Sequence, residues 1–306
     1  MNGCIIIDKP QDFTSFDVVA VMRRLCGERK IGHTGTLDPL ATGVLPLLLG
    51  RATRAASLLD DTDKEYEAGF RLGLSTDTLD ITGTVGKESK MTASKEQVEA
   101  VLPHFRGNIL QLPPMFSAVQ KNGQRLYTLA RQGIEIERDE RPATIYRLEL
   151  NEFDENTQSG SLMIRCSKGT YIRTICADIG EKLGTYGVMT SLRRTRAAGF
   201  SLKDAITIDE ARELSAQGWL AQKLLPTEAL FQNRPALRVS PAQAQRFQNG
   251  GALSLDRTSI LPRDKTDGMV FRVLAPAGDF LGLGVVELAK EQLSVLRLFA
   301  EPRAAE

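Results

Sequence analysis

Alternating apolar and polar positions predict the clearest β-strand of the chain, between residues 64 and 74. Every second residue from Tyr66 to Leu74 is apolar, whereas Glu65, Glu67 and Arg71 occupy positions between them. A period of two places these two sets on opposite faces, which is typical of a strand with one face in a core. Alternation and apolar runs predict further strands at residues 3–7, 143–153, 161–167 and 188–201.

Helices are predicted where apolar residues recur every three or four positions. Ile172, Ile175, Ile179 and Leu183 have this spacing, and Gly184 is expected to end their helix. Ser and Thr cap helices because their hydroxyls accept a hydrogen bond from the first turn. The predicted caps are Thr170 for this helix, Ser15 for a helix to about Cys26, and Ser94, in a capping box with Gln97, for a helix to about His104. Other helices are expected at about 124–132, at 208–217 and after Ser240-Pro241.

The order of these elements predicts an α+β chain with two parts. Strands and helices are intermixed in the first part, and apolar strands at 269–275, 280–288 and 293–299 follow a linker-like stretch at 224–237. Glycine and proline interrupt segments 31–43 and 113–124, which are therefore expected to be loops, the second with an Asn122-Gly123 turn. We expect a main domain at residues 1–230 and a small β-rich domain at residues 231–306.

The composition is that of an ordinary globular protein and excludes several classes. The chain has 306 residues, 42% of them hydrophobic and 25% charged. Its longest strongly apolar run, Val44 to Leu49, is far shorter than the ~20 residues of a membrane span. Four dispersed cysteines and two histidines indicate neither a disulfide framework nor a zinc site, and no Gly-rich nucleotide motif occurs. We expect a cytoplasmic protein with no membrane contact, metal or nucleotide cofactor.

Charge is distributed unevenly along the chain although the net charge is only +1. Segment 106–131 has four basic residues and no acidic one, and segment 160–203 carries a local charge of +6. Residues 204–306, in contrast, carry a charge of −1. A basic patch on a nearly neutral protein suits a polyanion such as nucleic acid, and a solvated charged surface is the alternative.

The loop at residues 32–50, GHTGTLDPLATGVLPLLLG, presents an aspartate between glycines and a proline. Pro39 favours extended backbone at Asp38, so the loop rather than a helix cap is expected to present this carboxylate. From spacing alone, a turn residue is the commoner explanation of such an aspartate.

Five segments, in the same order, resemble motifs of the TruB family of tRNA pseudouridine-55 synthases. They are IIIDKPQDFTSFDVV, GHTGTLDPLATGVLPLLLGRATR, KEYEAGFRLGLSTDTLDITG, SKGTYIRTICADIGEKLG and SLRRTRAAGF. The resemblance implies a mixed-sheet catalytic core, an inserted arm at about 106–142, a C-terminal domain similar to the RNA-binding PUA domain, and no metal or organic cofactor. It implies a monomeric isomerase that flips a T-loop uridine of tRNA, cleaves its glycosidic bond and reattaches the base through C5. The C-terminal domain is expected to contact the acceptor end weakly.

The resemblance implies catalytic roles for three residues. Asp38 matches the family's catalytic aspartate, which would attack C1′ or remove a sugar proton. Arg173 matches the arginine that pairs with it, and a cation in the first turn of a helix opposes the helix dipole unless it has such a partner. Tyr66 matches the ring that stacks on the uracil, with its hydroxyl placed for proton transfer at C5. A core tyrosine and an exposed or phosphate-binding arginine are the alternatives.

For other residues the resemblance implies contact with RNA. His33 would occupy the space that the flipped base leaves. Tyr171 and Leu192 would keep the base pocket dry, or simply belong to the core. Arg54 would contact a phosphate or stabilise the fold. The charge of the predicted arm, which includes Lys121 and Arg125, suits backbone phosphates.

Two other function classes compete with the isomerase. An RNA-binding or RNA-folding protein with the same scaffold would not need Asp38, Tyr66 and Arg173 together, although a role in tRNA folding is compatible with the chemistry. A methyltransferase acting on the same loop would need a Gly-rich cofactor loop, which the sequence lacks. The three residues together favour the isomerase.

Overall fold

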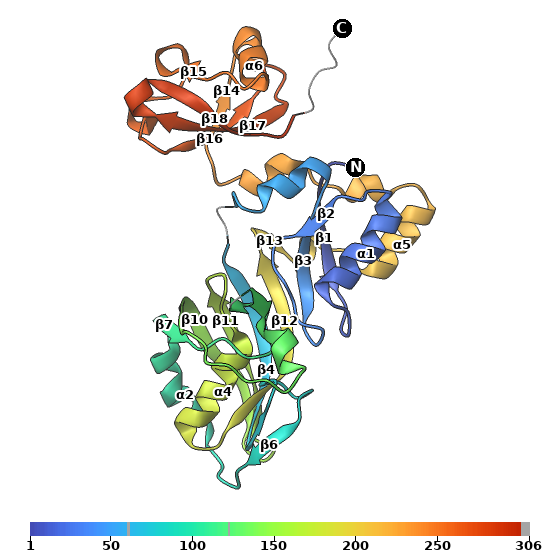
Figure 1. Ribbon diagram of the computed structural model, residues 1–306, viewed down its shortest axis with the longest axis vertical. Helices are drawn as coiled ribbons and strands as arrows, with labels where there is room; N and C mark the ends of the chain where they lie inside the picture. The colour runs from blue at the N-terminus through green and yellow to red at the C-terminus, as the bar shows by residue number, and fades with distance from the viewer. Residues whose placement is uncertain (60–61, 122, 301–306) are drawn as a thin grey trace.

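The computed structural model describes residues 1–59, 62–121 and 123–300, and a mixed β-sheet forms its largest part (Figure 1). The strands of this sheet are β1 (Gly3–Lys9), β2 (Ile31–His33), β3 (Thr42–Leu49), β4 (Lys64–Leu72), β7 (Gly107–Gln111), β10 (Arg141–Asp154), β11 (Ser159–Cys166), β12 (Gly187–Ala197) and β13 (Phe200–Ser201). Their order is β1-β3-β12-β4-β11-β10-β7, with β2 paired to β3 and β13 paired to β12. The β3–β12 pair is parallel, whereas β4 is antiparallel to both of its neighbours. This sheet confirms the predicted α+β fold.

Helices cover both halves of the sheet (Figure 1). They are α1 (Ser15–Cys26), α2 (Lys95–Val101), α3 (Leu126–Ala130), α4 (Ile172–Leu183), α5 (Ile208–Ala216) and α6 (Pro241–Gln248). Helices α2 and α4 pack against β4 and β11, and α1 and α5 pack against β1 and β3. The alternation predicted for β4 is confirmed, because Tyr66, Ala68 and Phe70 are all buried against α4. In the part of the chain that the structure describes, no helix is long and apolar enough to cross a membrane.

Two predicted helix caps are wrong by one residue. Thr14 caps α1, because its hydroxyl accepts from the backbone N–H of Asp17, and Ser15 is buried inside the first turn. Tyr171 precedes α4 without a side-chain cap, and the Thr170 hydroxyl donates instead to the Ser167 carbonyl. At α1 two adjacent residues could cap, and the bonds of Ser15 to Leu37 leave Thr14 as the cap.

Strands occur in segments 31–43 and 113–124, which were expected to be loops, and in segment 124–132, which was expected to be a helix. Segment 31–43 includes β2 and the start of β3, which continues through Pro46. A short hairpin of β8 (Gln120–Lys121) with β9 (Gln124–Arg125) lies in the other two segments, and a further hairpin, β5 (Leu74–Thr76) with β6 (Val85–Glu88), follows the predicted strand at 64–74. The β8–β9 hairpin shortens the predicted helix at 124–132 to α3. Of the predicted Asn122-Gly123 turn, Asn122 lies outside the described residues, and Gly123 has a φ of +80°.

A second, smaller sheet forms a separate C-terminal β-rich domain (Figure 1). Its strands are β14 (Ala236–Arg238), β15 (Leu253–Ser254), β16 (Val270–Leu274), β17 (Phe280–Glu287) and β18 (Gln292–Leu298), in the order β14-β16-β17-β18-β15. Helix α6, predicted after Ser240-Pro241, packs on this sheet through Phe247, and Ser240 caps it. The three longest strands match the three predicted from apolar runs.

The linker-like stretch at 224–237 packs tightly between the two sheets. Its short 3₁₀ helix ends at Phe231, which is 1% exposed. The Phe231 ring lies 6.2 Å from the ring centroid of Phe280 and 5.7 Å from that of Phe299. The same cluster includes Cys4 and Ile6 of β1. The C-terminal domain is therefore joined to the main sheet by a shared apolar core, where the sequence suggests an open linker.

Truncation of this ring is expected to lower the stability of the whole chain. Phe231→Ala should reduce the free energy of unfolding by about 3–5 kcal/mol, because it leaves a cavity in a buried aromatic cluster. Urea unfolding measures the change. Phe16→Ala is the matched control, because that ring is 64% exposed, and it should change stability by only about 0.5 kcal/mol. An equally mild effect of Phe231→Ala would mean that the domain is separable.

Candidate active site

A cavity of ≈350 Å³ opens beside the loop that carries Asp38. Of the sequence-predicted site residues, the structure places five around it: Asp38, Tyr66, Tyr171, Arg173 and Leu192. They come from the loop between β2 and β3, from β4 and β12, and from the start of α4. Segments far apart in the sequence therefore meet at one cavity.

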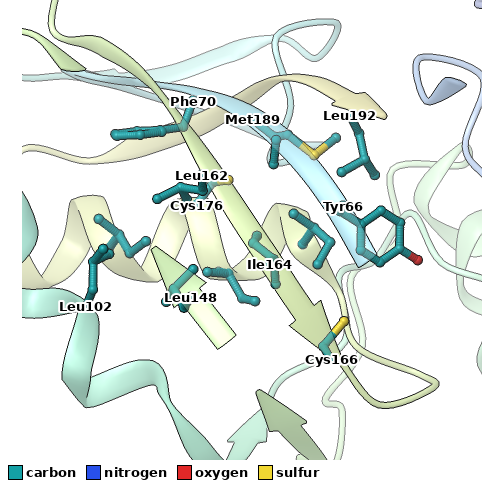
Figure 2. Packing of buried hydrophobic residues seen from close by; sticks show 14 of the residues in the cluster. Tyr66, Phe70, Leu102, Leu148, Leu162, Ile164, Cys166, Cys176, Met189 and Leu192 are labelled. Carbon is teal, nitrogen blue, oxygen red and sulfur yellow. The ribbon is translucent and has the colours of Figure 1, made fainter. Parts of the chain in front are cut away.

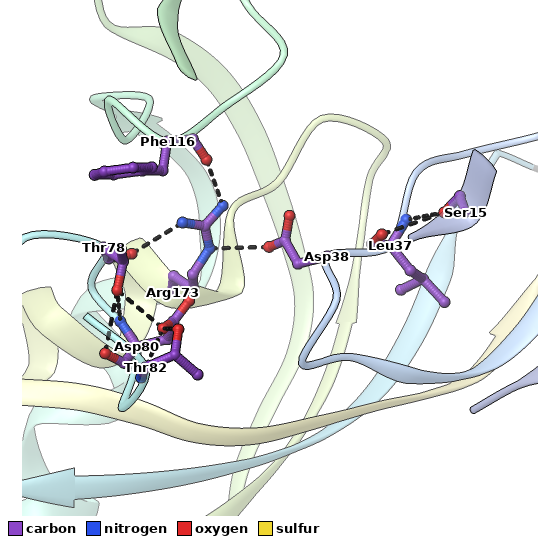
Figure 3. A network of polar contacts seen from close by, with 8 residues as sticks. All are labelled: Ser15, Leu37, Asp38, Thr78, Asp80, Thr82, Phe116 and Arg173. Atoms are coloured by element: carbon purple, nitrogen blue, oxygen red, sulfur yellow. Dashed lines mark hydrogen bonds and ion pairs between the residues drawn. The ribbon is translucent and has the colours of Figure 1, made fainter. Parts of the chain in front are cut away.

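Asp38 and Arg173 form an ion pair at this cavity (Figure 3). Nε of Arg173 lies 3.0 Å from Oδ2 of Asp38. The other two guanidinium nitrogens donate to backbone carbonyls, Nη1 to Thr78 at 2.9 Å and Nη2 to Phe116 at 2.8 Å. The Arg173 side chain is 6% exposed and that of Asp38 is 38% exposed. The arginine is thus fixed in three directions, and the carboxylate that it orients is accessible from the cavity.

The residues on either side of Asp38 are tied to the N-terminal strand and helix. The Leu37 N–H donates to Oγ of Ser15 at 2.8 Å, and that hydroxyl donates to the Leu37 carbonyl at 3.2 Å (Figure 3). The Pro39 carbonyl accepts from the Asp12 N–H at 2.9 Å and from Nζ of the buried Lys9 at 3.3 Å. Burial lowers the pKa of Lys9 to about 8. Ser15, expected to cap a helix, thus holds the Asp38 loop instead.

A buried aspartate organises the loop that contacts Arg173 from the other side (Figure 3). Oδ1 of Asp80 accepts from the Thr78 hydroxyl at 2.9 Å, and from the N–H and hydroxyl of Thr82 at 3.0 and 2.5 Å. These bonds fix the turn that aims the Thr78 carbonyl at Arg173. Sequence reasoning assigned Asp80 no role; its signal was an acidic residue, with Asp77 close by, among closely spaced threonines.

Tyr66 lies at the end of the buried cluster, beside Leu192 (Figure 2). The tyrosine is 6% exposed and Leu192 is 8% exposed. Figure 2 shows the Tyr66 hydroxyl directed away from the rest of the cluster. Burial raises the pKa of this phenol to about 12, and the adjacent Arg194 opposes part of the rise. The ring is therefore neutral at pH 7 and forms an apolar wall of the cavity.

Four other predicted residues do not line this cavity. His33 lies in β2 with a half-buried ring, whose pKa is lowered by burial. Arg54 is exposed on the 3₁₀ helix Gly50–Ala55. In the segment between β7 and β10, Lys121 donates to the Glu137 carbonyl at 2.8 Å, and the Arg125 guanidinium lies 5.9 Å from the Tyr127 ring. Contact of these residues with RNA is therefore a proposal.

Two lysines line the cavity in addition to the predicted residues, Lys64 of β4 and Lys168 of the loop before α4. Burial lowers the pKa of Lys64. Their charges face a cavity whose carboxylate is already paired with Arg173. The opening of the cavity is therefore positively charged, which suits the anionic phosphate backbone of RNA. Among the described residues, no group of three or more His, Cys, Asp or Glu side chains could hold a metal ion.

The sequence matches two family descriptions that together span most of the main sheet and its helices. Residues 23–172 match the TruB family pseudouridylate synthase N-terminal domain, and residues 173–232 match the tRNA pseudouridylate synthase B C-terminal domain. A tRNA pseudouridine synthase B from Pseudomonas fluorescens (strain Pf0-1) is 44% identical, over 94% of this chain and 92% of its own length. The protein of that name from Bacillus pumilus (strain SAFR-032) is 41% identical over 96% of both chains.

Solved structures share the fold. The crystal structure of a Cbf5-Nop10-Gar1 complex has a TM-score of 0.73 and 25% identity, over 97% of this chain and 85% of that chain. A structure of an H/ACA RNP bound to a substrate RNA containing 2′-deoxyuridine has a TM-score of 0.72 and 22% identity, over 98% of this chain and 85% of that chain. With identities above 40% to relatives over nearly their whole length, the chain belongs to the TruB family of tRNA pseudouridine-55 synthases, which isomerise a uridine of tRNA to pseudouridine.

Proposed function

We propose that the chain modifies the T-loop uridine of tRNA, at position 55, with Asp38 as its catalytic carboxylate. The observation that carries the proposal is the Asp38–Arg173 ion pair of 3.0 Å at a cavity walled by Tyr66 and Leu192. A nucleotide must leave the loop of the tRNA to reach such a cavity, and aromatic and apolar side chains commonly hold extruded bases.

The proposed reaction begins at C1′ of the uridine. In one route an Asp38 oxygen attacks C1′, the C1′–N1 bond breaks, and its electron pair stays on the uracil. The uracil then rotates, C5 bonds to C1′, and the carboxylate leaves unchanged. The C5 proton departs and N1 gains a proton, so the product is an isomer of the substrate. In the second route Asp38 removes a sugar proton as the C1′–N1 bond breaks, and it returns that proton to the same carbon when C5 bonds to C1′.

The neighbouring residues have separate proposed roles in this reaction. Arg173 orients the Asp38 carboxylate. The Tyr66 ring stacks on the uracil, and its hydroxyl takes part in proton transfer at C5. Tyr171 and Leu192 exclude water from the base, since both line the cavity. A dry site strengthens the electrostatic interactions within it.

We propose that the surface around the cavity binds the T-arm. His33 fills the space left by the extruded base, and Arg54 contacts a phosphate. The inserted arm, residues 106–142, contributes Lys121 and Arg125. In the free chain Lys121 pairs with Asp139 at 3.6 Å, and a phosphate would replace this exposed partner.

Neutralising the two arm residues is expected to weaken salt-dependent binding. Each phosphate contact contributes roughly 0.7 to 0.9 to the slope of log affinity against log salt, so Lys121→Gln with Arg125→Gln should flatten the slope by about 1.4 to 1.8. Filter binding at several salt concentrations measures it. The matched control is Lys95→Gln with Arg212→Gln, because both are exposed members of ion pairs outside the arm. An unchanged slope in the arm variant would exclude contact with phosphates.

The remaining partner assignments follow from the chain as a whole. We propose a monomer, because the cavity is complete within one chain. The domain at 231–306 has ten basic and eight acidic residues, and this small net charge supports only weak contact with the acceptor end. A cytoplasmic location fits four cysteines that are all free and buried.

Loss of hydrogen from C5 tests this function. An isolated T stem-loop with tritium at C5 of the target uridine should release tritium into water with no cofactor added. The release is expected because the hydrogen on C5 is lost when C5 bonds to C1′. The same stem-loop with tritium only on its other uridines is the control and should release none. Tight binding without any release would favour the RNA-folding alternative over the isomerase.

A further inference from the structure

Arg194 is a buried arginine to which the mechanism above gives no role. The residue lies in β12 and is 0% exposed. Its guanidinium donates to three backbone carbonyls, those of Val44 at 2.7 Å, Gly35 at 3.2 Å and Thr36 at 3.4 Å. No carboxylate of the described residues forms an ion pair with it. A buried cation without an anionic partner is costly, and the three carbonyls offset part of this cost.

The close approach of β3 and β12 brings Arg194 to these carbonyls. The two strands pair in parallel, with Arg194 opposite Gly43. Gly43 has a φ of +102°, and a Cβ built there would lie 2.2 Å from the Arg194 carbonyl oxygen. Only glycine therefore permits this approach. The guanidinium is fixed at the base of the Asp38 loop as a result.

Arg194 also lies beside Tyr66, on the neighbouring strand β4. The two residues are direct cross-strand partners in the β4–β12 pair, so their side chains share one face of the sheet. The positive charge of Arg194 opposes part of the rise that burial causes in the pKa of the Tyr66 phenol. Arg194 thus brings an unneutralised positive charge to the hydroxyl that faces the cavity.

We propose that Arg194 is a positioning residue that acts through Tyr66, holding the hydroxyl in place and stabilising negative charge on it during proton transfer. The inference rests on the proposed function, which gives Tyr66 a part in the reaction. The Asp38 loop has its own anchors at Leu37 and Pro39, so loss of Arg194 should act on the tyrosine before it acts on the aspartate.

Other charged or titratable groups also face Tyr66 from the elements packed around it. They are Asp38 of the loop, Arg173 of α4, Lys64 of β4 and Cys166 of β11. Arg173 is paired with Asp38, and Cys166 is a neutral buried thiol whose pKa burial raises to about 11. Lys64 donates to the Thr62 carbonyl. Of these groups, Arg194 is the cation directly opposite Tyr66 in the β4–β12 pair.

Kinetics of the full chain separate this role from a structural one. Arg194→Gln should lower kcat by about thirtyfold or more, because a buried positive charge beside the hydroxyl is lost, while the Kd for tRNA stays within about threefold. Arg193→Gln is the matched control, because its side chain pairs with Asp8 on the opposite face of β12, and it should leave both quantities unchanged. In a Tyr66→Phe background, Arg194→Gln should add less than about threefold. A full additional loss in that background would overturn the proposal.

A spectroscopic readout independent of activity completes the test. In Arg194→Gln, a 3-fluorotyrosine at position 66 should titrate about one pH unit or more higher by ¹⁹F NMR, because a positive charge that favours the phenolate is removed. Arg194→Lys should keep most of the shift, and an unchanged midpoint in Arg194→Gln would overturn the proposal. If the Arg194 variants do not fold, Tyr66→Phe in the otherwise unchanged chain tests the contact. It should lower the urea midpoint, because the polar hydroxyl beside the buried guanidinium is lost, and an unchanged midpoint would contradict it.

Discussion

Asp38→Asn is expected to abolish pseudouridine formation while the affinity for tRNA stays within about threefold of the wild type. The substitution keeps the size of the side chain but removes its charge and its nucleophilic oxygen. Loss of a nucleophile or essential base typically costs about 10⁴-fold or more in rate. The loop itself should persist, because its bonds at Leu37 and from the Ala41 N–H to the Asp38 carbonyl do not use the carboxylate. Single-turnover kinetics and filter binding measure the two effects.

Asp12→Asn provides the matched control for this substitution. Asp12 is exposed, has a φ of 65°, and contacts the same loop only through its backbone N–H. Asparagine tolerates this left-handed backbone, so the rate should be unchanged. An Asp38→Asn enzyme within tenfold of the wild type, a barrier change of about 1.4 kcal/mol, would remove Asp38 from its proposed role.

Arg173→Lys is expected to lower the rate of modification by roughly 10² to 10⁴ without weakening tRNA binding. The guanidinium donates in three directions, to Asp38 and to the carbonyls of Thr78 and Phe116. An ammonium at the end of a flexible stem does not reproduce this planar arrangement. Loss of two charge-assisted bonds of about 1.5–3 kcal/mol each gives the expected range. The expected loss is therefore in kcat, because the arginine acts on the carboxylate rather than on the RNA.

The matched control is the same Arg→Lys substitution, which also keeps the charge, at an exposed site. Arg147→Lys serves, because Arg147 is 58% exposed and pairs with Glu149 on the sheet surface. It should leave kcat and Kd unchanged. Small, equal effects of Arg173→Lys on kcat and Kd would instead identify Arg173 as a phosphate contact.

Elements with a regular period could be predicted from the sequence, and elements defined by their partners could not. Strand β4 and helix α4 each carry a buried face that the periodicity shows directly. In contrast, β3 contains a glycine at its start and Pro46 within it, and pairing with β1 makes it a strand. The three-residue β2 likewise depends on β3. Local preference for turns was therefore overridden by pairing.

The same distinction applies to the candidate site. Arg173 could be singled out because a positive charge in the first turn of a helix opposes the helix dipole, which indicates a partner outside the helix. Its other two partners, the carbonyls of Thr78 and Phe116, belong to the backbone and leave no signal in residue type. The contact between Arg194 and Tyr66 depends on strand register across more than a hundred residues. The spacing of residues along the chain does not show which residues of β4 and β12 pair with each other.

Position-resolved mapping of pseudouridine in an unmodified tRNA transcript tests the central claim most directly. The wild-type chain, with no cofactor added, should form one pseudouridine per tRNA at position 55 and none elsewhere. A folded Asp38→Asn chain that binds the same tRNA should form none. Modification at a different position, no modification by the wild type, or undiminished modification by Asp38→Asn would contradict the account.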